Sequence, residues 1–195
     1  MISLLLDSAN TYLVVGLAKD GKVIDKIVYE AWQKQSELMI PELDKILKRN
    51  NIDPKSVGEI IVTKGPGSYT GVRIALTIAK IYAYTLNIPC YLLSSLKVLG
   101  KKDVPSICLI NARSNRSYFA VYKNDECIIE DKILKNDEVM NYINEHKDYA
   151  VCGITNYLPE VNREQNDLVE NMLRLKTEKD LATNTLAIKA VYLKD

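Results

Sequence analysis

The residues best suited to chemistry lie in Gly65-Pro66-Gly67-Ser68-Tyr69-Thr70-Gly71, a segment that joins an apolar run to a predicted helix. Backbone N–H groups are unpaired at the start of a helix, and the helix dipole favours an anion such as phosphate there. The segment is not a Walker A loop, because no Lys-Ser or Lys-Thr follows, and its glycine spacing is not that of the dinucleotide-binding fingerprint. The candidate residues for holding an anion or nucleotide are Gly65, Gly67, Ser68, Thr70 and Gly71.

The same segment has a second interpretation that needs no ligand. Glycine permits a positive φ angle in a tight turn, and a serine or threonine ahead of a helix caps its first N–H groups. Ser68 or Thr70 would then only begin the helix. Both interpretations stay open from the sequence.

Asp7 is a further candidate, because it ends the first apolar run of the chain. In the turn Asp7-Ser8-Ala9-Asn10, short polar side chains can bond the backbone and close the loop. Alternatively, the Asp7 carboxylate lies at the carboxyl edge of a sheet and faces the glycine segment, where it would position a metal-bound nucleotide. The sequence does not decide between these two roles.

Arg73 lies in the first turn of the helix that follows the glycine segment, where a cation opposes the helix dipole. We therefore expect an acidic group beside it. A bound phosphate, Asp7 or a partner protein's carboxylate would each serve, and we favour an internal or partner carboxylate.

Composition excludes several classes of function. With 26 basic and 25 acidic residues the net charge is +1, which gives no electrostatic footprint for binding nucleic acid without a partner. The first apolar run meets Asp7 too soon for a signal peptide or a membrane span. We therefore expect a cytoplasmic protein without membrane contact.

Cysteines and histidine give no pattern typical of a reactive or metal-binding site. Cys90, Cys108, Cys127 and Cys152 form no C-x-x-C pair and are predicted to be reduced core residues. The one histidine, His146, is predicted to be solvated near the end of a polar helix. We therefore predict no catalytic residue and no metal site.

Hydrophobic patterning predicts that the first half is an α/β unit in the order β-β-β-α-β-α-β. Asp20-Gly21 provides a type I′ turn between the second and third strands. The strand ahead of the glycine segment is apolar without interruption from Ile60 to Val62, as expected when both faces are covered. The predicted strands are Ile2 to Asp7, Tyr12 to Lys19, Lys22 to Glu30, Glu59 to Thr63 and Cys90 to Leu93, and the predicted helices run from Ser36 to about Asn50 and from about Thr70 to Asn87.

A polar stretch from Leu99 to Pro105 marks the expected boundary between two domains, residues 1–100 and 101–195. The second half partly repeats the first, with three strand-like runs, a polar helix and a further short strand. The predicted strands are Ser106 to Ile110, Ser117 to Lys123, Glu126 to Ile133 and Tyr149 to Cys152, and the predicted helices are Asn136 to His146 and Leu168 to Leu175.

The helix near residues 70–87 is apolar on more sides than one sheet can cover. Ala75, Ala79 and Ala83 form a flat stripe that permits close approach of another helix. A helix deep inside one domain explains this pattern about as well as a helix-mediated interface, in which the helix near Ser36 would complete half of an intermolecular four-helix bundle. The candidate interface residues are Met39, Leu43, Ile46, Arg73, Ala75, Ile78, Ala79, Tyr82 and Ala83.

Several segments are similar to those of one known family, the bacterial TsaB proteins, also called YeaZ. Leu6-Asp7-Ser8-Ala9 resembles the end of the family's first strand, and Lys64 to Ile74 resembles its hallmark segment. Asn111-Ala112-Arg113, followed by Tyr118 to Tyr122, resembles the family's Asp-Ala-Arg and the strand after it. Tyr192-Leu193-Lys194 resembles its common Tyr-Leu-Arg ending.

The sequence departs from this family in three places. Asn111 replaces the usual aspartate, Gln35 stands about where many members have histidine, and the carboxyl-terminal half is short. These departures weaken the expectation that a nucleotide binds. They do not touch the two helices expected to form the interface.

The resemblance implies an actin-like ATPase (ribonuclease H-like) fold, with two βββαβα-type halves of which the second is reduced. It implies a non-catalytic scaffold for the related protein TsaD, which transfers a threonylcarbamoyl group to adenosine 37 of tRNA, in an assembly joined by TsaE. It also implies a homodimer when the chain is alone, only indirect contact with tRNA, and no cofactor, with ATP or ADP held by the partner or at the complex interface.

The alternatives are enzymes. One is an ATP-binding phosphotransferase-like enzyme of the actin-like class, and the other is a glycoprotease-like peptidase. A peptidase needs a nucleophile with its base or a metal site, and the chain supplies neither pattern.

Overall fold

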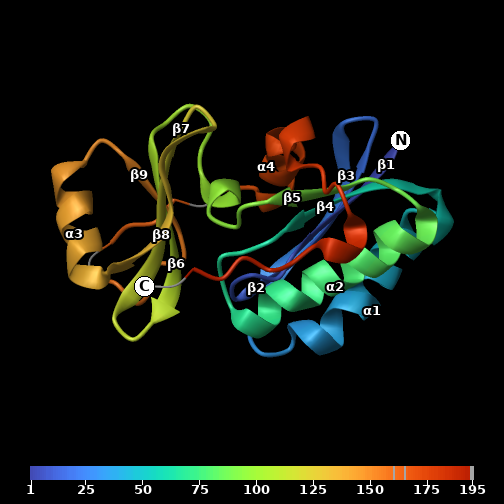
Figure 1. Cartoon of the computed structure of the whole chain (residues 1–195), viewed down its shortest axis with the longest axis horizontal. Helices are drawn as coiled ribbons and strands as arrows, with labels where there is room; N and C mark the ends of the chain where they lie inside the picture. Colours follow the sequence, from blue (N-terminus) through green and yellow to red (C-terminus); the bar gives the residue numbers. More distant parts are fainter. Residues whose placement is uncertain (160, 165, 194–195) are drawn as a thin grey trace.

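The structure, a computed structural model, describes residues 1–159, 161–164 and 166–193. Lys194, part of the predicted carboxyl-terminal motif, lies outside them. Two sheets occupy opposite ends of the long axis of the molecule, each with helices against it (Figure 1). This is the α/β architecture that the sequence pattern predicts.

The first sheet consists of β1 (Ile2–Asp7), β2 (Tyr12–Lys19), β3 (Lys22–Glu30), β4 (Val57–Thr63) and β5 (Cys90–Leu93). Its strand order is β3-β2-β1-β4-β5, so the predicted antiparallel meander is confirmed and the two later strands add parallel to β1. The predicted turn between β2 and β3 is also confirmed, because Asp20 and Gly21 have φ angles of 51° and 77°.

The middle of the first sheet is buried on both faces. The side chains of residues 4–6 in β1 and 60–62 in β4 have no exposed surface. Neighbouring residues of a strand point to opposite faces, so both faces must be covered. α1 (Gln35–Arg49) and α2 (Tyr69–Leu86) cover one face, and α4 (Leu168–Leu175) covers the other (Figure 1).

α1 begins differently from the prediction, which placed a cap at Ser36. The helix begins at Gln35, and Lys34 at the N-cap position makes no side-chain capping bond. Gln35 is buried, and its Nε2 donates a hydrogen bond of 3.0 Å to the carbonyl oxygen of Asn10. The start of α1 is therefore fixed by the turn between β1 and β2 rather than by a serine cap.

The second sheet consists of β6 (Ser106–Arg113), β7 (Arg116–Lys123), β8 (Glu126–Lys135) and β9 (Ala150–Gly153), and α3 (Asn136–Glu145) lies between β8 and β9 in the chain. Its order, β8-β7-β6-β9, repeats an antiparallel meander with one parallel strand added. β6 and β8 run beyond their predicted ends at Ile110 and Ile133, because both keep pairing with Arg116 and Ser117 at the start of β7. The second half is thus a shorter version of the first.

The end of the chain returns to the first sheet. Leu181 forms a bridge with Tyr91, and the N–H of Val191 donates to the carbonyl oxygen of Lys64 at 2.7 Å. α4 lies so close to β2 that a Cβ at Gly16 would be 2.4 Å from a methyl carbon of Val169. Residues 168–193 therefore contact the first half, although the predicted division placed them in the second; the division itself stays a prediction.

Cysteine burial is mostly as predicted. Cys90, Cys108 and Cys152 are buried, and burial raises the pKa of each thiol. Cys127 is exposed, so its prediction as a core residue is wrong. The reason is that it lies on β8, an edge strand of the second sheet.

Candidate functional site

The glycine segment packs directly against the turn that follows β1. A Cβ at Gly67 would lie 2.2 Å from the carbonyl oxygen of Ala9, and a Cβ at Gly71 would lie 2.1 Å from that of Ser8. Gly65 has a φ angle of 101°, and a Cβ there would lie 2.7 Å from the carbonyl oxygen of Val191, which is still too close. These positions require glycine because other backbone segments occupy the space of a side chain.

N–H groups that an anion would use are already engaged. The N–H of Ser68 donates to the carbonyl oxygen of Ala9 at 2.7 Å, and the N–H of Gly71 donates to the Ser68 hydroxyl at 3.3 Å. Ser68 is therefore the cap of α2, as one of the two predicted alternatives holds, and Thr70 lies exposed in its first turn. These contacts fit a packed turn rather than a phosphate cradle, and anion binding stays a prediction.

Asp7 is buried at the edge of the first sheet rather than open to a ligand. Only 3% of it is exposed. Its Oδ1 accepts a hydrogen bond from the hydroxyl of Thr63 and another, of 2.9 Å, from the N–H of Ala9. Burial raises the pKa of this carboxyl, and the hydrogen bonds offset part of that rise. The arrangement fits the turn role of Asp7 better than a metal-bound nucleotide.

Arg73 has aromatic neighbours where the sequence predicted an acidic one. Its guanidinium carbon lies 3.9 Å from the centroid of the Tyr69 ring and 5.6 Å from that of Tyr192. The two tyrosine rings are themselves stacked, with centroids 5.0 Å apart. Within the described residues Arg73 makes no ion pair, so the expected internal carboxylate is absent and the partner alternative stays open.

Most of the predicted interface residues form the core of this chain. Six of them are buried between the helices and the first sheet: Met39, Leu43, Ile46, Ala75, Ala79 and Ala83. The alanine stripe lets α2 approach the sheet, so of the two interpretations of that stripe the intramolecular one accounts for it. Ile78 and Tyr82 are half-buried and Arg73 is exposed. The prediction that α1 and α2 form an interface stays untested.

The outer side of the two helices carries a different set of residues. We term this surface the helix-pair face and define it by the exposed residues Glu37, Ile40, Tyr69, Arg73, Thr77, Ile81 and Tyr84. Ile40 from α1 and Ile74 and Ile78 from α2 line a groove of about 430 Å³ in it. Ile81 is 62% exposed. Large apolar side chains are thus open to solvent along both helices.

Sequence reasoning missed Ile40, Ile81 and Tyr84. A signal for them existed: at 3.6 residues per turn, Ile81 lies about half a turn away from both Ala79 and Ala83. If the alanines face the sheet, Ile81 must face outward. The sequence alone leaves open which side of α2 the sheet covers.

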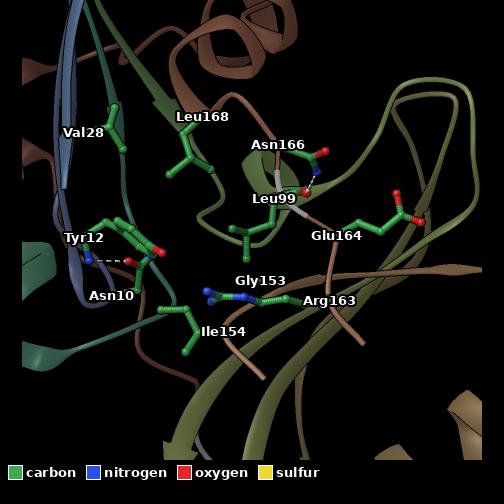
Figure 2. A pocket seen from close by; sticks show the side chains of 10 residues that line it. All are labelled: Asn10, Tyr12, Val28, Leu99, Gly153, Ile154, Arg163, Glu164, Asn166 and Leu168. Carbon is green, nitrogen blue, oxygen red and sulfur yellow. Dashed lines mark hydrogen bonds between the residues drawn. The ribbon is translucent and has the colours of Figure 1, made fainter. Parts of the chain in front are cut away.

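A second hollow lies between the two sheets (Figure 2). It has a volume of about 130 Å³, and Figure 2 shows Asn10 and Tyr12 on one side and Ile154 and Arg163 on the other. Much of its polar lining is satisfied within the chain: Asn10 accepts from the N–H of Tyr12 at 2.8 Å, and Asn166 donates to the carbonyl oxygen of Leu99. We assign no ligand to this hollow.

His146 is half-buried at the end of α3, so the prediction that it is solvated is wrong. Its ring stacks on Tyr142, with centroids 4.0 Å apart, and meets Tyr149 edge-on. The Tyr142 ring reaches it because residues four apart on a helix lie on the same side, and Tyr149 follows three residues later in the chain. Over the ranges 1–159, 161–164 and 166–193, no three His, Cys, Asp or Glu side chains are grouped so as to hold a metal ion.

Comparison with known proteins finds one matching family model and several similar proteins. A family model described as TsaD, tRNA N6-adenosine threonylcarbamoyltransferase, matches residues 27–166. The tRNA threonylcarbamoyladenosine biosynthesis protein TsaB of Bacillus subtilis is 31% identical over 144 residues, which are 72% of this chain and 62% of that protein. An uncharacterized protein of Mycoplasma pneumoniae is 29% identical over 201 residues, which are 98% of this chain and 94% of that protein.

A solved structure, YeaZ from Pseudomonas aeruginosa, superposes with a TM-score of 0.76 over 98% of this chain and 99% of that one, at 19% identity. At this identity the likeness shows the fold alone, and it confirms the predicted actin-like (ribonuclease H-like) architecture with its reduced second half. The matching family model covers more than half of the sequence. The chain therefore belongs to the TsaD family of that model and, within it, to the TsaB (YeaZ) family.

Proposed function

We propose that this chain is a non-catalytic TsaB subunit of tRNA threonylcarbamoyladenosine biosynthesis. In this proposal it binds TsaD and supports that enzyme while it transfers a threonylcarbamoyl group to adenosine 37 of tRNA. Family membership supports the pathway. The observation that carries the scaffold role is the helix-pair face.

The helix-pair face supports binding because it leaves large apolar side chains in water. Exposed Ile40 and Ile81 flank the half-buried Ile74 and Ile78, across two adjacent helices. Single exposed apolar residues are common, but a continuous group of them marks an interaction surface. The groove among these side chains suits the apolar anchor residues of a partner protein.

A non-catalytic role is supported by what the former candidate residues do. Asp7 bonds Thr63 and the backbone of its own turn, and the glycine segment packs on Ser8 and Ala9. These groups are engaged in holding the fold. In the described part of the chain, these contacts favour neither the phosphotransferase alternative nor the peptidase alternative.

The proposed assembly includes further partners besides TsaD. TsaE is a further partner of the assembly, tRNA is contacted only indirectly, and ATP or ADP is held by the partner or at the complex interface. Two copies pair when the chain is alone. In the described part of the chain no helix combines the length and the apolar character needed to cross a membrane. The proposed location is the cytoplasm.

Reconstituted transfer tests the proposal. The assay measures threonylcarbamoyl transfer to tRNA by TsaD and TsaE with the wild-type chain, with the Ile81→Glu variant, or with neither. We expect transfer to require the chain and to fall about tenfold or more with Ile81→Glu, since a buried interface anchor is lost.

The matched control is Ile128→Glu, because Ile128 is also an exposed isoleucine but lies on β8 of the second sheet. It should support transfer as the wild-type chain does. Full transfer without the chain, or equal loss with both variants, contradicts the scaffold role.

A further inference from the structure

We propose that Tyr192 is a positioning residue for the binding of TsaD: together with Tyr69 it holds the guanidinium of Arg73 in place to receive a carboxylate of the partner. The inference rests on the proposed function, in which TsaD binds the helix-pair face. It goes further by naming a residue outside the two helices that prepares this face, and the chemistry of the group that the face receives.

The segment that carries Tyr192 is fixed along α2 by contacts of its backbone. The ammonium group of Lys80, in the middle of α2, donates to the carbonyl oxygen of Ile188 at 3.3 Å, and Ile188 itself is buried. Three residues later, the N–H of Val191 donates to the carbonyl oxygen of Lys64, ahead of α2, at 2.7 Å. The segment therefore runs beside α2 toward its first turn and places Tyr192 there (Figure 1).

Two aromatic rings reach the guanidinium of Arg73. Its carbon lies 3.9 Å from the centroid of the Tyr69 ring and 5.6 Å from that of Tyr192, and the two centroids are 5.0 Å apart. These distances close a compact triangle, so Tyr192 lies beside the guanidinium and not on the far side of the Tyr69 ring. A cation within about 6 Å of a ring centroid is attracted by the ring. Tyr192 therefore adds a second aromatic contact, which α2 alone does not supply.

A guanidinium held in this way keeps its hydrogen-bonding edge for a partner. The group is planar, and its N–H donors point outward from the edge, where they can bind a carboxylate through two parallel bonds. Arg73 is exposed and makes no ion pair with the residues that the structure describes. In the first turn of α2 it also opposes the helix dipole, which a carboxylate beside it would relieve. An acidic side chain of TsaD is therefore the group that suits Arg73.

Ordering of Arg73 in advance is how Tyr192 would strengthen binding. A long, flexible side chain loses rotational freedom when a partner immobilises it, and this loss weakens the complex. An arginine that two rings already hold loses less. The backbone around Tyr192 is fixed at Ile188 and Val191, so the ring is in place before the partner arrives.

NMR relaxation in the chain without TsaD tests the first step. The Nε–Hε group of Arg73 should be ordered in wild type and in Tyr192→Phe, which keeps the ring, and clearly more mobile in Tyr192→Leu. Lys189→Leu is the matched control, because Lys189 is an exposed residue of the same segment and belongs neither to the helix-pair face nor to its groove. It should leave Arg73 ordered. Equal mobility of Arg73 in wild type and in Tyr192→Leu overturns the inference.

Calorimetric titration with TsaD tests the second step. We expect Tyr192→Leu to weaken binding about three- to tenfold, and Tyr192→Phe and Lys189→Leu to bind within about twofold of wild type. Arg73→Gln should weaken binding about tenfold or more, because arginine is often an anchor residue of an interface. Adding Tyr192→Leu to Arg73→Gln should weaken it by at most about a further twofold, since Tyr192 acts through Arg73. Independent losses in the double variant overturn the positioning role.

Ionic strength tests the carboxylate. Salt screens a charge pair, so the affinity of wild type for TsaD should fall several-fold when salt rises from about 50 to about 500 mM, and the affinity of Arg73→Gln should fall less. Arg73→Lys keeps the charge but not the planar fork, so it should bind more weakly than wild type at low salt. Equal salt dependence of wild type and Arg73→Gln overturns the carboxylate, and an Arg73→Lys variant that binds as wild type does overturns the positioning role.

These measurements separate the inference from the proposed function. A wild-type chain that does not bind TsaD overturns the proposed function, whatever the mobility of Arg73. Binding that Ile81→Glu weakens but Tyr192→Leu leaves unchanged overturns the positioning role of Tyr192 alone.

Discussion

The guanidinium carbon of Arg73 lies 3.9 Å from the centroid of the Tyr69 ring, so a cation in the first turn of α2 is held by an aromatic face. The ring of Tyr192, near the carboxyl end of the described chain, stacks on the same Tyr69 ring. Through this stack, the segment that contains Tyr192 packs against the start of α2, beside the helix-pair face.

A double-mutant cycle at the two tyrosines measures this attachment. Stacked aromatic pairs contribute about 0.5 to 1.5 kcal/mol beyond the area that they bury. We expect Tyr69→Leu and Tyr192→Leu to show a coupling free energy of that size when unfolding is followed in urea. Strict additivity of the two substitutions contradicts the stacked arrangement.

Gly67→Ala tests the close packing of the glycine segment. The new methyl group would lie 2.2 Å from the carbonyl oxygen of Ala9, a backbone atom that cannot move without losing its bond to the N–H of Ser68. We expect the free energy of unfolding to fall by about 3 kcal/mol or more. Denaturation in urea gives the value.

Gly58→Ala is the control for that substitution. A Cβ there would first meet the side chain of Met1, which is flexible and can turn away. We expect the free energy of unfolding to fall by no more than about 1 kcal/mol. Equal losses at the two glycines contradict the account of the segment.

Ala79→Glu tests which side of α2 faces the sheet. Ala79 has no exposed surface, so a carboxylate at this position is buried without a partner and should lower the free energy of unfolding by about 3 kcal/mol or more. Thr77→Glu, on the exposed side of the same helix, should change it by about 0.5 kcal/mol or less. Thermal or chemical denaturation of both variants compares the two sides, and a stable Ala79→Glu protein would place the alanine stripe at the surface.

The burial of Asp131 predicts the direction in which the free energy of unfolding changes with pH. Its carboxyl accepts hydrogen bonds from the hydroxyls of Ser94, at 2.5 Å, and Tyr122, at 2.8 Å, and thereby links the first half of the chain to the second sheet. Burial raises its pKa above the ordinary value of 3.8, and the two hydroxyls offset part of the rise. The folded state thus holds the proton more tightly than the unfolded state does.

The free energy of unfolding contributed by Asp131 should therefore be largest below pH 3.8 and fall as the pH rises through the raised pKa. Asp131→Asn cannot titrate. Urea unfolding at a series of pH values gives the free energy of unfolding of both proteins. The value for wild type minus the value for the variant should decline as the pH rises from 3.8 through the raised pKa, and then stay level. A difference that grows with pH contradicts the burial of this carboxyl.

Prediction from sequence succeeded where periodicity alone decides the structure. The meander of β1 to β3 and the uninterrupted apolar run in β4 follow from alternation and from burial on both faces. Polar strand ends were harder, because the last residues of β6 and β8 are held by pairing with β7 rather than by burial. The pattern of hydrophobic residues gives no information about that pairing between strands.

The candidate site was predicted only in part, for a related reason. The motif identified the segment around Gly67, but its chemistry depended on whether the turn at Ser8 would occupy the space beside it. The pattern of α2 identified an unusual helix, but it did not say which side the sheet covers. Both questions depend on contacts between residues far apart in the chain.

The binding of the cognate TsaD to this chain tests the central claim most directly. Calorimetric titration should show a complex with the wild-type chain and with Ile128→Glu, and binding about tenfold weaker or more with Ile81→Glu, because only Ile81 lies on the helix-pair face. A wild-type chain that does not bind TsaD, or an Ile81→Glu variant that binds as tightly as wild type, contradicts the account.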